Sequence, residues 1–229
     1  MRAIAHRGCM AQYPENTLEA FRASSAVVEM IELDVRRCGS GELVVLHDET
    51  LDRTTDATGG VASTSLDELR DVSVLGTDES PPLVSEVFEA VPPDVGLNIE
   101  LKVQGIAADV VDIASEYDHE VIVSSFGPDT VTDARKAGVS SLAFLIDDDF
   151  DVGSALDIAG DLGCAYVHPH VNLCLDTDIV ERAHERGFDI NAWTAADRDT
   201  VGELRDRGVD GAIIGDCELA AICNGEGRC

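Results

Sequence analysis

Two acidic residues and a histidine near the start of the chain could do metal-assisted acid–base chemistry. Glu32 and Asp34 are separated by one residue in a predicted β-strand at 30–35, so their side chains project from the same face, about 7 Å apart at Cα. Neighbouring carboxylates repel each other unless a positive group lies between them, and a divalent cation is the usual solution. His47 and Asp48 follow a second apolar strand, and histidine acts as an acid or a base near neutral pH. The alternative is a solvated edge strand followed by a histidine with no chemical role.

A third carboxylate lies in the predicted strand at 96–101. Asn98, Glu100 and Lys102 share one face there, while leucine and isoleucine fill the other. Polar groups on the inward face of a barrel strand cost free energy unless they are used. Three oxygen ligands without clustered cysteine or histidine favour Mg²⁺, Ca²⁺ or Mn²⁺ over Zn²⁺. We therefore expect one divalent cation at Glu32, Asp34 and Glu100.

Two basic residues lie beside the expected cation. Arg7 and Lys102, together with a divalent ion, would form an anion site, and phosphate is the commonest ligand of such a site. His6 and His47 would flank the phosphate. One histidine can accept the proton of the nucleophile while the other protonates the leaving alkoxide, as cleavage of a phosphodiester requires.

The elements that must position these residues alternate between strand and helix. Strands are predicted at 3–5, 30–35, 43–46, 96–101, 121–125, 141–145, 165–168, 189–193 and 211–215. Helices are predicted at 14–27, 83–91, 106–117, 128–137, 152–162, 177–186, 198–207 and 217–223. Eight βα units predict a closed (β/α)₈ TIM barrel, an α/β fold in which the chemistry lies at the carboxyl ends of the strands. An open doubly wound sheet is the rival, but no glycine-rich phosphate loop follows the first strand.

The polar, turn-rich segment at about 49–82 interrupts this alternation, apart from a short helical pattern at 66–72. We interpret it as a small insertion after the second strand, placed over the surroundings of His47. The whole chain, 1–229, is then expected to be a single domain.

Composition limits the possible partners. Lys+Arg of 16 against Asp+Glu of 45 gives a net charge of −29, and the only lysines are Lys102 and Lys136, so no basic face is expected for nucleic acid. A hydrophobic content of 45% excludes disorder as the reason for the acidity. The acidity is typical of halophilic proteins, and we expect the fold to weaken in dilute buffer. An unchanged melting temperature between low and molar KCl would contradict this.

No segment has the length and composition of a membrane span or a signal peptide, so we expect a cytoplasmic protein without stable membrane association. The sequence does not indicate an oligomeric state. Seven cysteines are scattered without a C-x-x-C pair, and we expect buried or terminal free thiols rather than a metal or redox tail. They are Cys9, Cys38, Cys164, Cys174, Cys217, Cys223 and Cys229.

The order of motifs along nearly the whole chain resembles that of the glycerophosphodiester phosphodiesterases. The motifs are His6-Arg7-Gly8, Pro14-Glu15-Asn16-Thr17, Glu32-Leu33-Asp34, His47-Asp48, Arg53-Thr54-Thr55, Asn98-Ile99-Glu100-Leu101-Lys102, Asn191-Ala192-Trp193-Thr194 and Gly208-Val209-Asp210-Gly211. One departure is Gly215-Asp216-Cys217, where the family usually has Thr-Asp and soon a proline. This puts contacts from the last loop in doubt.

The resemblance implies a (β/α)₈ barrel with a small insertion and assigns a role to each candidate residue. His6 and His47 would be the acid–base pair, Glu32, Asp34 and Glu100 would hold the metal, and Arg7 and Lys102 would bind phosphate. Glu15 and Asn16 would brace the site, and Trp193 would wall the glycerol pocket, unless it is a barrel-core aromatic. His168 and His170 match no motif and are expected to be structural.

The expected activity is metal-dependent hydrolysis of a small-molecule glycerophosphodiester to glycerol phosphate and an alcohol. The attacking group is either metal-activated water or the substrate's own neighbouring hydroxyl. One alternative is a lysophospholipase D or sphingomyelinase-like enzyme on the same barrel, which would act on lipid and would need an apolar rim around its site. The other is a non-catalytic phosphodiester or metal sensor, which would not need both histidines.

Overall fold

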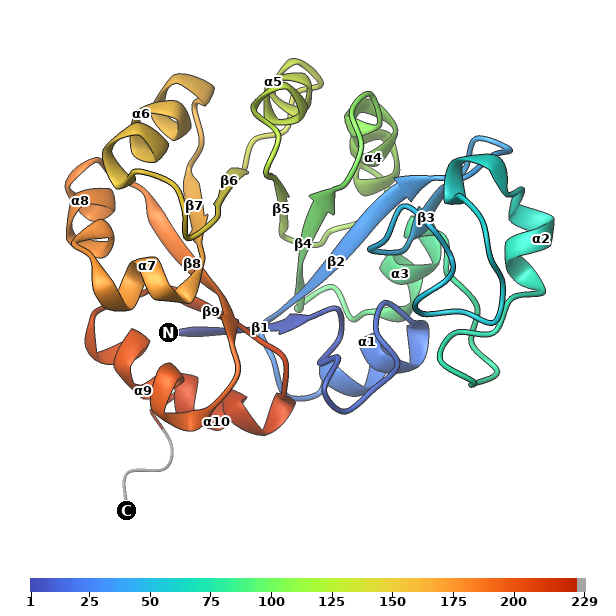
Figure 1. Ribbon diagram of the computed structural model, residues 1–229, viewed down its shortest axis with the longest axis horizontal. Helices are drawn as coiled ribbons and strands as arrows, with labels where there is room; N and C mark the ends of the chain where they lie inside the picture. The colour runs from blue at the N-terminus through green and yellow to red at the C-terminus, as the bar shows by residue number, and fades with distance from the viewer. Residues whose placement is uncertain (226–229) are drawn as a thin grey trace.

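Eight parallel strands close into a barrel within residues 1–225, which are the residues that the computed structural model describes (Figure 1). They are β1 (Arg2–His6), β2 (Met30–Arg37), β4 (Gly96–Leu101), β5 (Val121–Ser125), β6 (Leu142–Ile146), β7 (Tyr166–Pro169), β8 (Asp189–Ala195) and β9 (Gly211–Ile214). Because β1 pairs with β9 on one side and with β2 on the other, the barrel is closed and none of its eight parallel strands is an edge strand. The predicted TIM barrel is confirmed.

Helices surround the barrel on its outer side (Figure 1). They are α1 (Leu18–Ser24), α3 (Val84–Ala90), α4 (Ala107–Ala114), α5 (Pro128–Lys136), α6 (Val152–Leu162), α7 (Val171–Asp176), α8 (Ile179–Glu185), α9 (Arg198–Asp206) and α10 (Ala220–Cys223), preceded by the 3₁₀ turn η2 (Cys217–Leu219). The main core lies between barrel and helices, where Leu97, Ile99 and Leu101 of β4 are at most 2% exposed and belong to the same cluster as Phe88 of α3. The alternation of β4 therefore sends Asn98 and Glu100 to the barrel interior, as predicted.

The insertion after the second strand begins as a hairpin. The end of β2 pairs antiparallel with β3 (Leu43–Val45), and the chain then forms the turn η1 (Val61–Ser63) and helix α2 (Leu66–Arg70). Ser65 starts α2 in a capping box with Glu68. A small apolar cluster of its own stabilises this segment. The insertion thus follows the second strand, as predicted, and begins with β3.

Several element boundaries differ from the predictions. The helix predicted at 14–27 spans only Leu18–Ser24, because Asn16 has a φ of 59° and Thr17 caps the first turn through its hydroxyl. Helix α7 was not predicted. It begins directly after β7 at the capping residue His170 and is only six residues long, so its sequence has too few turns to show a helical period.

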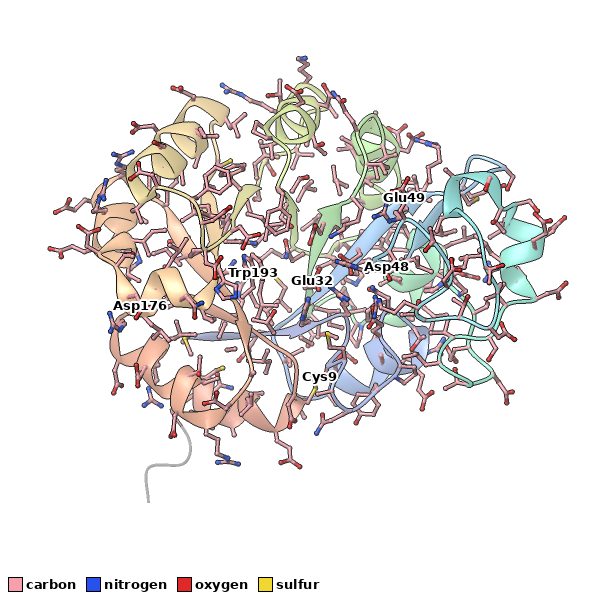
Figure 2. All side chains as sticks on the ribbon, in the orientation of Figure 1. Cys9, Glu32, Asp48, Glu49, Asp176 and Trp193 are labelled. Atoms are coloured by element: carbon pink, nitrogen blue, oxygen red, sulfur yellow. A yellow bond between two sulfur atoms is a disulfide. The ribbon has the colours of Figure 1, made fainter. Side chains whose placement is uncertain are left out.

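The expectation of free thiols is wrong for two cysteines, because Cys9, which is labelled in Figure 2, and Cys217 form a disulfide. They lie 208 residues apart in sequence, but barrel closure brings the loop after β1 against the segment after β9. Two hydrogen bonds join the same segments, from Ala11 N–H to the Gly215 carbonyl and from Cys217 N–H to Gln12 Oε1.

Cys38, Cys164, Cys174 and Cys223 are free, and Cys229 lies outside the described residues. No helix in the described part of the chain is long and apolar enough to cross a membrane.

Candidate active site

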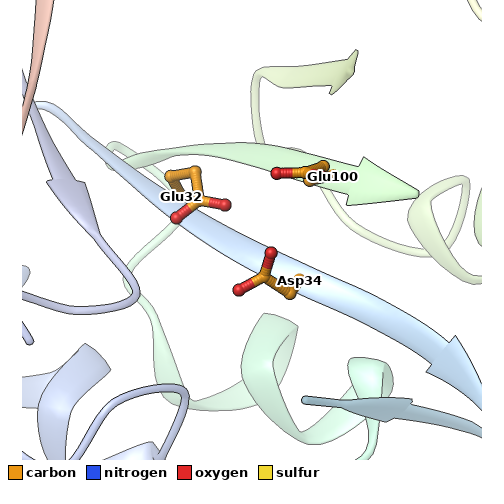
Figure 3. A group of neighbouring side chains, drawn as sticks. All are labelled: Glu32, Asp34 and Glu100. Atoms are coloured by element: carbon orange, nitrogen blue, oxygen red, sulfur yellow. The ribbon is translucent and has the colours of Figure 1, made fainter. Parts of the chain in front are cut away.

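Three carboxylates meet at the carboxyl ends of β2 and β4 (Figure 3). The parallel register places Asp34 opposite Glu100, and Glu32 precedes Asp34 on the same face. Ligand oxygens of Glu32, Asp34 and Glu100 lie within 4.8 Å of one another, and the residues are 3%, 0% and 9% exposed. Glu32 Oε1 and Asp34 Oδ1 are buried without a hydrogen-bond partner. The alternative of a solvated edge strand is wrong, because β2 is paired on both sides.

The electrostatics of this cluster fit a divalent cation. Burial, with repulsion from Asp34, raises the pKa of Glu32 well above its usual range and that of Glu100 to about 7. Burial would also raise the pKa of Asp34, but Arg7 and Lys102 outweigh it and lower that pKa. A bound cation would replace the protons that Glu32 and Glu100 otherwise retain, and its oxygen ligands would be those that Mg²⁺ or Ca²⁺ prefers.

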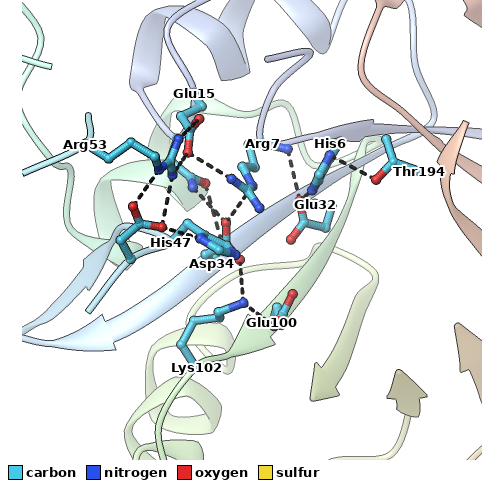
Figure 4. A network of polar contacts seen from close by, with 12 residues as sticks. His6, Arg7, Glu15, Glu32, Asp34, His47, Arg53, Glu100, Lys102 and Thr194 are labelled. Atoms are coloured by element: carbon cyan, nitrogen blue, oxygen red, sulfur yellow. Dashed lines mark hydrogen bonds and ion pairs between the residues drawn. The ribbon is translucent and has the colours of Figure 1, made fainter. Parts of the chain in front are cut away.

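The charge balance around the cluster points the same way (Figure 4). Five carboxylates face three basic side chains; the acids are Glu15, Glu32, Asp34, Asp48 and Glu100, and the bases are Arg7, Arg53 and Lys102. With every group ionised, these side chains carry two more negative than positive charges, which one divalent cation would neutralise.

Arg7 and Lys102 reach the cluster from opposite sides. Arg7 Nε lies 3.2 Å from Asp34 Oδ2, its Nη1 donates to Glu15 Oε1 at 3.0 Å, and its backbone N–H donates to Glu32 Oε2 at 3.0 Å. Lys102 Nζ lies 2.5 Å from Glu100 Oε1 and 3.5 Å from Asp34 Oδ1. Both cations therefore contact the carboxylates while they line the same cavity.

The loop after β1 holds Arg7 by an uncommon backbone path. Arg7, Gly8 and Cys9 have φ values of 50°, 77° and 66°, a backbone conformation that residues other than glycine rarely adopt. Asn16 fastens the loop to the cluster, because its Nδ2 donates to Asp34 Oδ2 at 2.8 Å and its Oδ1 accepts from the Asp34 backbone N–H at 3.4 Å. The structure thus places Glu15 and Asn16 directly behind the basic and acidic groups of the site.

The two histidines line one cavity from different strands. His6 ends β1, where its Nε2 lies 3.8 Å from Glu32 Oε2 and its Nδ1 lies 3.4 Å from Thr194 Oγ1. Burial, with the positive charge of Arg7, lowers the pKa of His6 to about 4. His47 follows β3, and its Nδ1 lies 2.6 Å from Asp48 Oδ1. Burial lowers the pKa of His47 as well, although Asp34 and Asp48 oppose this.

The cavity has a volume of about 180 Å³ and lies at the carboxyl ends of the strands. Its charged and polar lining is His6, Arg7, Glu32, His47, Asn98, Glu100, Lys102 and Thr194, and its apolar lining is Phe126, Leu145, Trp193 and Ile213. Trp193 donates from Nε1 to the His168 carbonyl at 2.7 Å and meets the ring of Phe126 edge to face at 5.4 Å. Trp193 thus forms part of the cavity wall and also packs against an apolar cluster that includes Ile213.

Some residues at the site were not predicted from the sequence. Phe126, Leu145 and Ile213 line the cavity, but single apolar residues at strand ends are too common to indicate a site. Thr194 and Arg53 were noted only as parts of motifs, yet Thr194 lines the cavity and Arg53 bridges Glu15 and Asp48. Neither His168, which is fully buried, nor His170 lines the cavity.

The comparisons with known proteins agree with this geometry. The sequence matches the glycerophosphoryl diester phosphodiesterase family over residues 6–219. A glycerophosphodiester phosphodiesterase of Caldanaerobacter subterraneus subsp. tengcongensis is 32% identical over 243 residues, which cover 94% of this chain and 94% of that protein.

Two solved structures have the same fold over nearly their full length. A phosphodiesterase of Oleispira antarctica in complex with the product sn-glycerol-3-phosphate has a TM-score of 0.89 at 25% identity, covering 98% of this chain and 97% of that one. A glycerophosphodiester phosphodiesterase of Thermotoga maritima has a TM-score of 0.85 at 27% identity, with 97% and 98% covered. The extent of the family match and of the sequence identity confirms the resemblance: this chain belongs to the glycerophosphoryl diester phosphodiesterase family.

Proposed function

We propose that the protein hydrolyses glycerophosphodiesters to glycerol phosphate and an alcohol, with one divalent cation and two histidines. The observation that carries the proposal is convergence: His6, His47, Arg7, Lys102 and two of the three carboxylates line one cavity, and the third carboxylate, that of Asp34, lies within 4.8 Å of the other two. A basic pair beside an acidic cluster suits a phosphodiester bound next to a cation.

The cation would be Mg²⁺ or Ca²⁺, with Mn²⁺ also compatible, held by Glu32, Asp34 and Glu100. When bound, it would withdraw charge from the phosphoryl oxygens and lower the pKa of a nearby hydroxyl or water. Arg7 and Lys102 would then turn from their carboxylate partners toward the phosphate oxygens, which are stronger acceptors of charge-assisted hydrogen bonds in this site.

The two imidazoles would move the protons of the reaction. One accepts the proton that the attacking water or neighbouring hydroxyl loses, and the other donates a proton to the alkoxide oxygen as its bond to phosphorus breaks. Asp48 accepts a hydrogen bond at His47 Nδ1 and so stabilises the protonated form of this ring, which favours His47 as the donor. Trp193 and Phe126 would cover the apolar edge of the glycerol.

The test is release of glycerol phosphate from glycerophosphocholine, glycerophosphoethanolamine and glycerophosphoglycerol in molar KCl, with EDTA or with added Mg²⁺, Ca²⁺ or Mn²⁺. We expect metal-dependent turnover by the wild-type protein and none by folded H6A or H47A. The matched control is H184A, since His184 lies on the outer helix α8 and pairs with Asp210. Activity retained by H6A or H47A would refute the assigned role, and binding without turnover would indicate a sensor.

A specific observation favours a second candidate activity, on lysolipids. Three apolar side chains, Met10, Phe126 and Phe150, are 37–39% exposed and lie in loops that follow strand ends on the cavity side of the barrel, and a fourth, Leu75, is 52% exposed in the insertion. Such residues could contact an acyl chain that leaves the cavity. Turnover of micellar lysophosphatidylcholine faster than glycerophosphocholine would support this activity, and the reverse order would support the soluble diester.

A further inference from the structure

Arg53 connects the insertion to the candidate active site without lining the cavity (Figure 4). Its guanidinium bonds to two carboxylates at once. Nε and Nη2 donate to Asp48 Oδ2 and Oδ1 at 2.5 and 3.1 Å, while Nη1 and Nη2 donate to Glu15 Oε2 and Oε1 at 2.9 and 2.8 Å. The side chain is 47% exposed, so its inner edge is bonded while its outer edge meets solvent. Arg53 can therefore affect a substrate only through other residues.

One of its partners holds His47. Asp48 Oδ1 accepts a hydrogen bond from Arg53 Nη2 and lies 2.6 Å from His47 Nδ1. Since Arg53 keeps Asp48 ionised and lowers its pKa, Asp48 acts as an acceptor and the proton of the neutral ring lies on Nδ1. Nε2 is then the ring nitrogen that can exchange a proton with a substrate. The His47 main chain is fixed separately, because its carbonyl accepts from Arg36 Nε at 2.9 Å.

Its other partner holds Arg7. Glu15 Oε1 accepts hydrogen bonds from both Arg53 Nη2, at 2.8 Å, and Arg7 Nη1, at 3.0 Å. Glu15 is only 6% exposed, and burial would raise its pKa, but the two arginines keep that pKa below its usual range. The bridge Arg7–Glu15–Arg53–Asp48–His47 thus runs without interruption from a phosphate-binding candidate to an acid–base candidate.

We propose that Arg53 is a positioning residue that fixes His47 relative to Arg7 through Asp48 and Glu15. The inference rests on the proposed function, in which a phosphate held by Arg7 must present its leaving oxygen to His47. A displacement of about 1 Å in such a geometry can cost roughly a hundredfold in rate. A lysine could not replace Arg53, because one ammonium group cannot make paired bonds to two carboxylates.

A structural role alone, the attachment of the insertion to the barrel, is the competing explanation. Arg70 provides the matched control because it also ties the insertion to the outer helices, through Nη2 to Glu86 Oε1 of α3 at 2.8 Å, and belongs to no part of the site. Both arginines are partly exposed, with side chains 47% and 37% accessible.

The experiment measures kcat and KM for glycerophosphocholine, or for the best substrate of the wild-type protein, with the activating metal in molar KCl. The full-length variants are R53K, R53M, D48N, E15Q and R70M, each checked by thermal unfolding. D48N should lower kcat at least tenfold with KM within about twofold, since Asp48 is the partner of Arg53 that contacts His47 directly. E15Q should chiefly raise KM, since Glu15 is the partner that contacts Arg7 directly. R53M and R53K should show both effects, and R70M neither.

Folded R53M or R53K with kcat and KM within twofold of wild type would overturn the inference, and so would equal losses in R53M and R70M. If R53M does not fold, R53K decides: a lower kcat together with a raised KM supports the bridge, and values of both within twofold of the wild type overturn it. A wild-type protein that turns over no diester would overturn the proposed function, and the inference with it.

Discussion

Gly8 is the residue at which the packing of the active-site loop can be measured most directly. Its φ is 77°, and a Cβ added there would lie 2.7 Å from Ala20 Cβ and 3.0 Å from both Ala20 C and Phe21 Cδ1. Gly76 in the insertion has nearly the same φ, 76°, but a Cβ there would meet nothing within 4 Å. Replacing each by alanine separates the cost of the backbone conformation from the cost of the clash.

The expected magnitudes follow from these two terms. An alanine at positive φ costs about 1 kcal/mol relative to glycine, and this applies to both sites. At Gly8 the clash with backbone and Cβ atoms of α1 cannot be relieved by a rotamer change, and overpacking of this kind costs about 2 kcal/mol more. G76A should therefore lower the free energy of unfolding by about 1 kcal/mol and G8A by about 3 kcal/mol. In melting temperature these are roughly 3 °C and 9 °C.

The assay is urea unfolding of both variants in molar KCl, followed by activity at a temperature where both are folded. G8A should also lower kcat/KM, since the backbone N–H of the preceding Arg7 donates to Glu32, whereas G76A should leave kcat/KM unchanged. Equal destabilisation by the two substitutions would refute the reasoning, because the φ values are matched and only the neighbours differ.

Three further predictions concern the cation, the buried histidine and the first helix. Because burial, with repulsion from Asp34, raises the pKa of Glu100 to about 7, binding of Mg²⁺ should release more protons at pH 6 than at pH 8; calorimetry in buffers of different ionisation enthalpy measures this, and a release independent of pH would contradict it. Burial lowers the pKa of His168 to about 3 from an ordinary 6.5, so its contribution to stability is complete above about pH 6.5 and is lost as the pH falls toward 3. Wild-type protein should lose about 3 kcal/mol through this residue between pH 7 and pH 4, and an H168Q variant with the same pH dependence of urea unfolding would count against it. The Thr17 hydroxyl caps α1 by accepting from Ala20 N–H and also donates to the Pro14 carbonyl, so T17A should cost about 2 kcal/mol; S65A, at the half-buried cap of α2, should cost about 1 kcal/mol or less, and thermal melts showing the opposite order would be inconsistent with the burial of Thr17.

The carboxylate face was predictable because strand alternation is a local property. Glu32 and Asp34 on β2, and Asn98 and Glu100 on β4, follow the two-residue period of a strand, and the βα repeat brings both strands to one end of a barrel. The register that sets Asp34 opposite Glu100 is known only from the structure.

Contacts between loops were not predictable in the same way. The disulfide joins residues from opposite ends of the chain, and cysteine spacing alone does not determine pairing. The double contact of Arg53 depends on how the insertion folds over the barrel, which no period in its sequence describes. Arg7 and Lys102 were predicted as an anion site, but only coordinates reveal that each also contacts the acidic cluster.

The disulfide between Cys9 and Cys217 also has a mechanical consequence. It closes residues 9–217 into a covalent ring with a sequence separation of 208 residues, so a force applied to the two ends of the chain passes through the sulfur–sulfur bond and does not stretch the segment from β2 to β9, whereas β1 lies outside the ring. Roughly 700 Å of contour length is thereby shielded from stretching. A single-molecule pulling experiment should release that length only after a reductant is added.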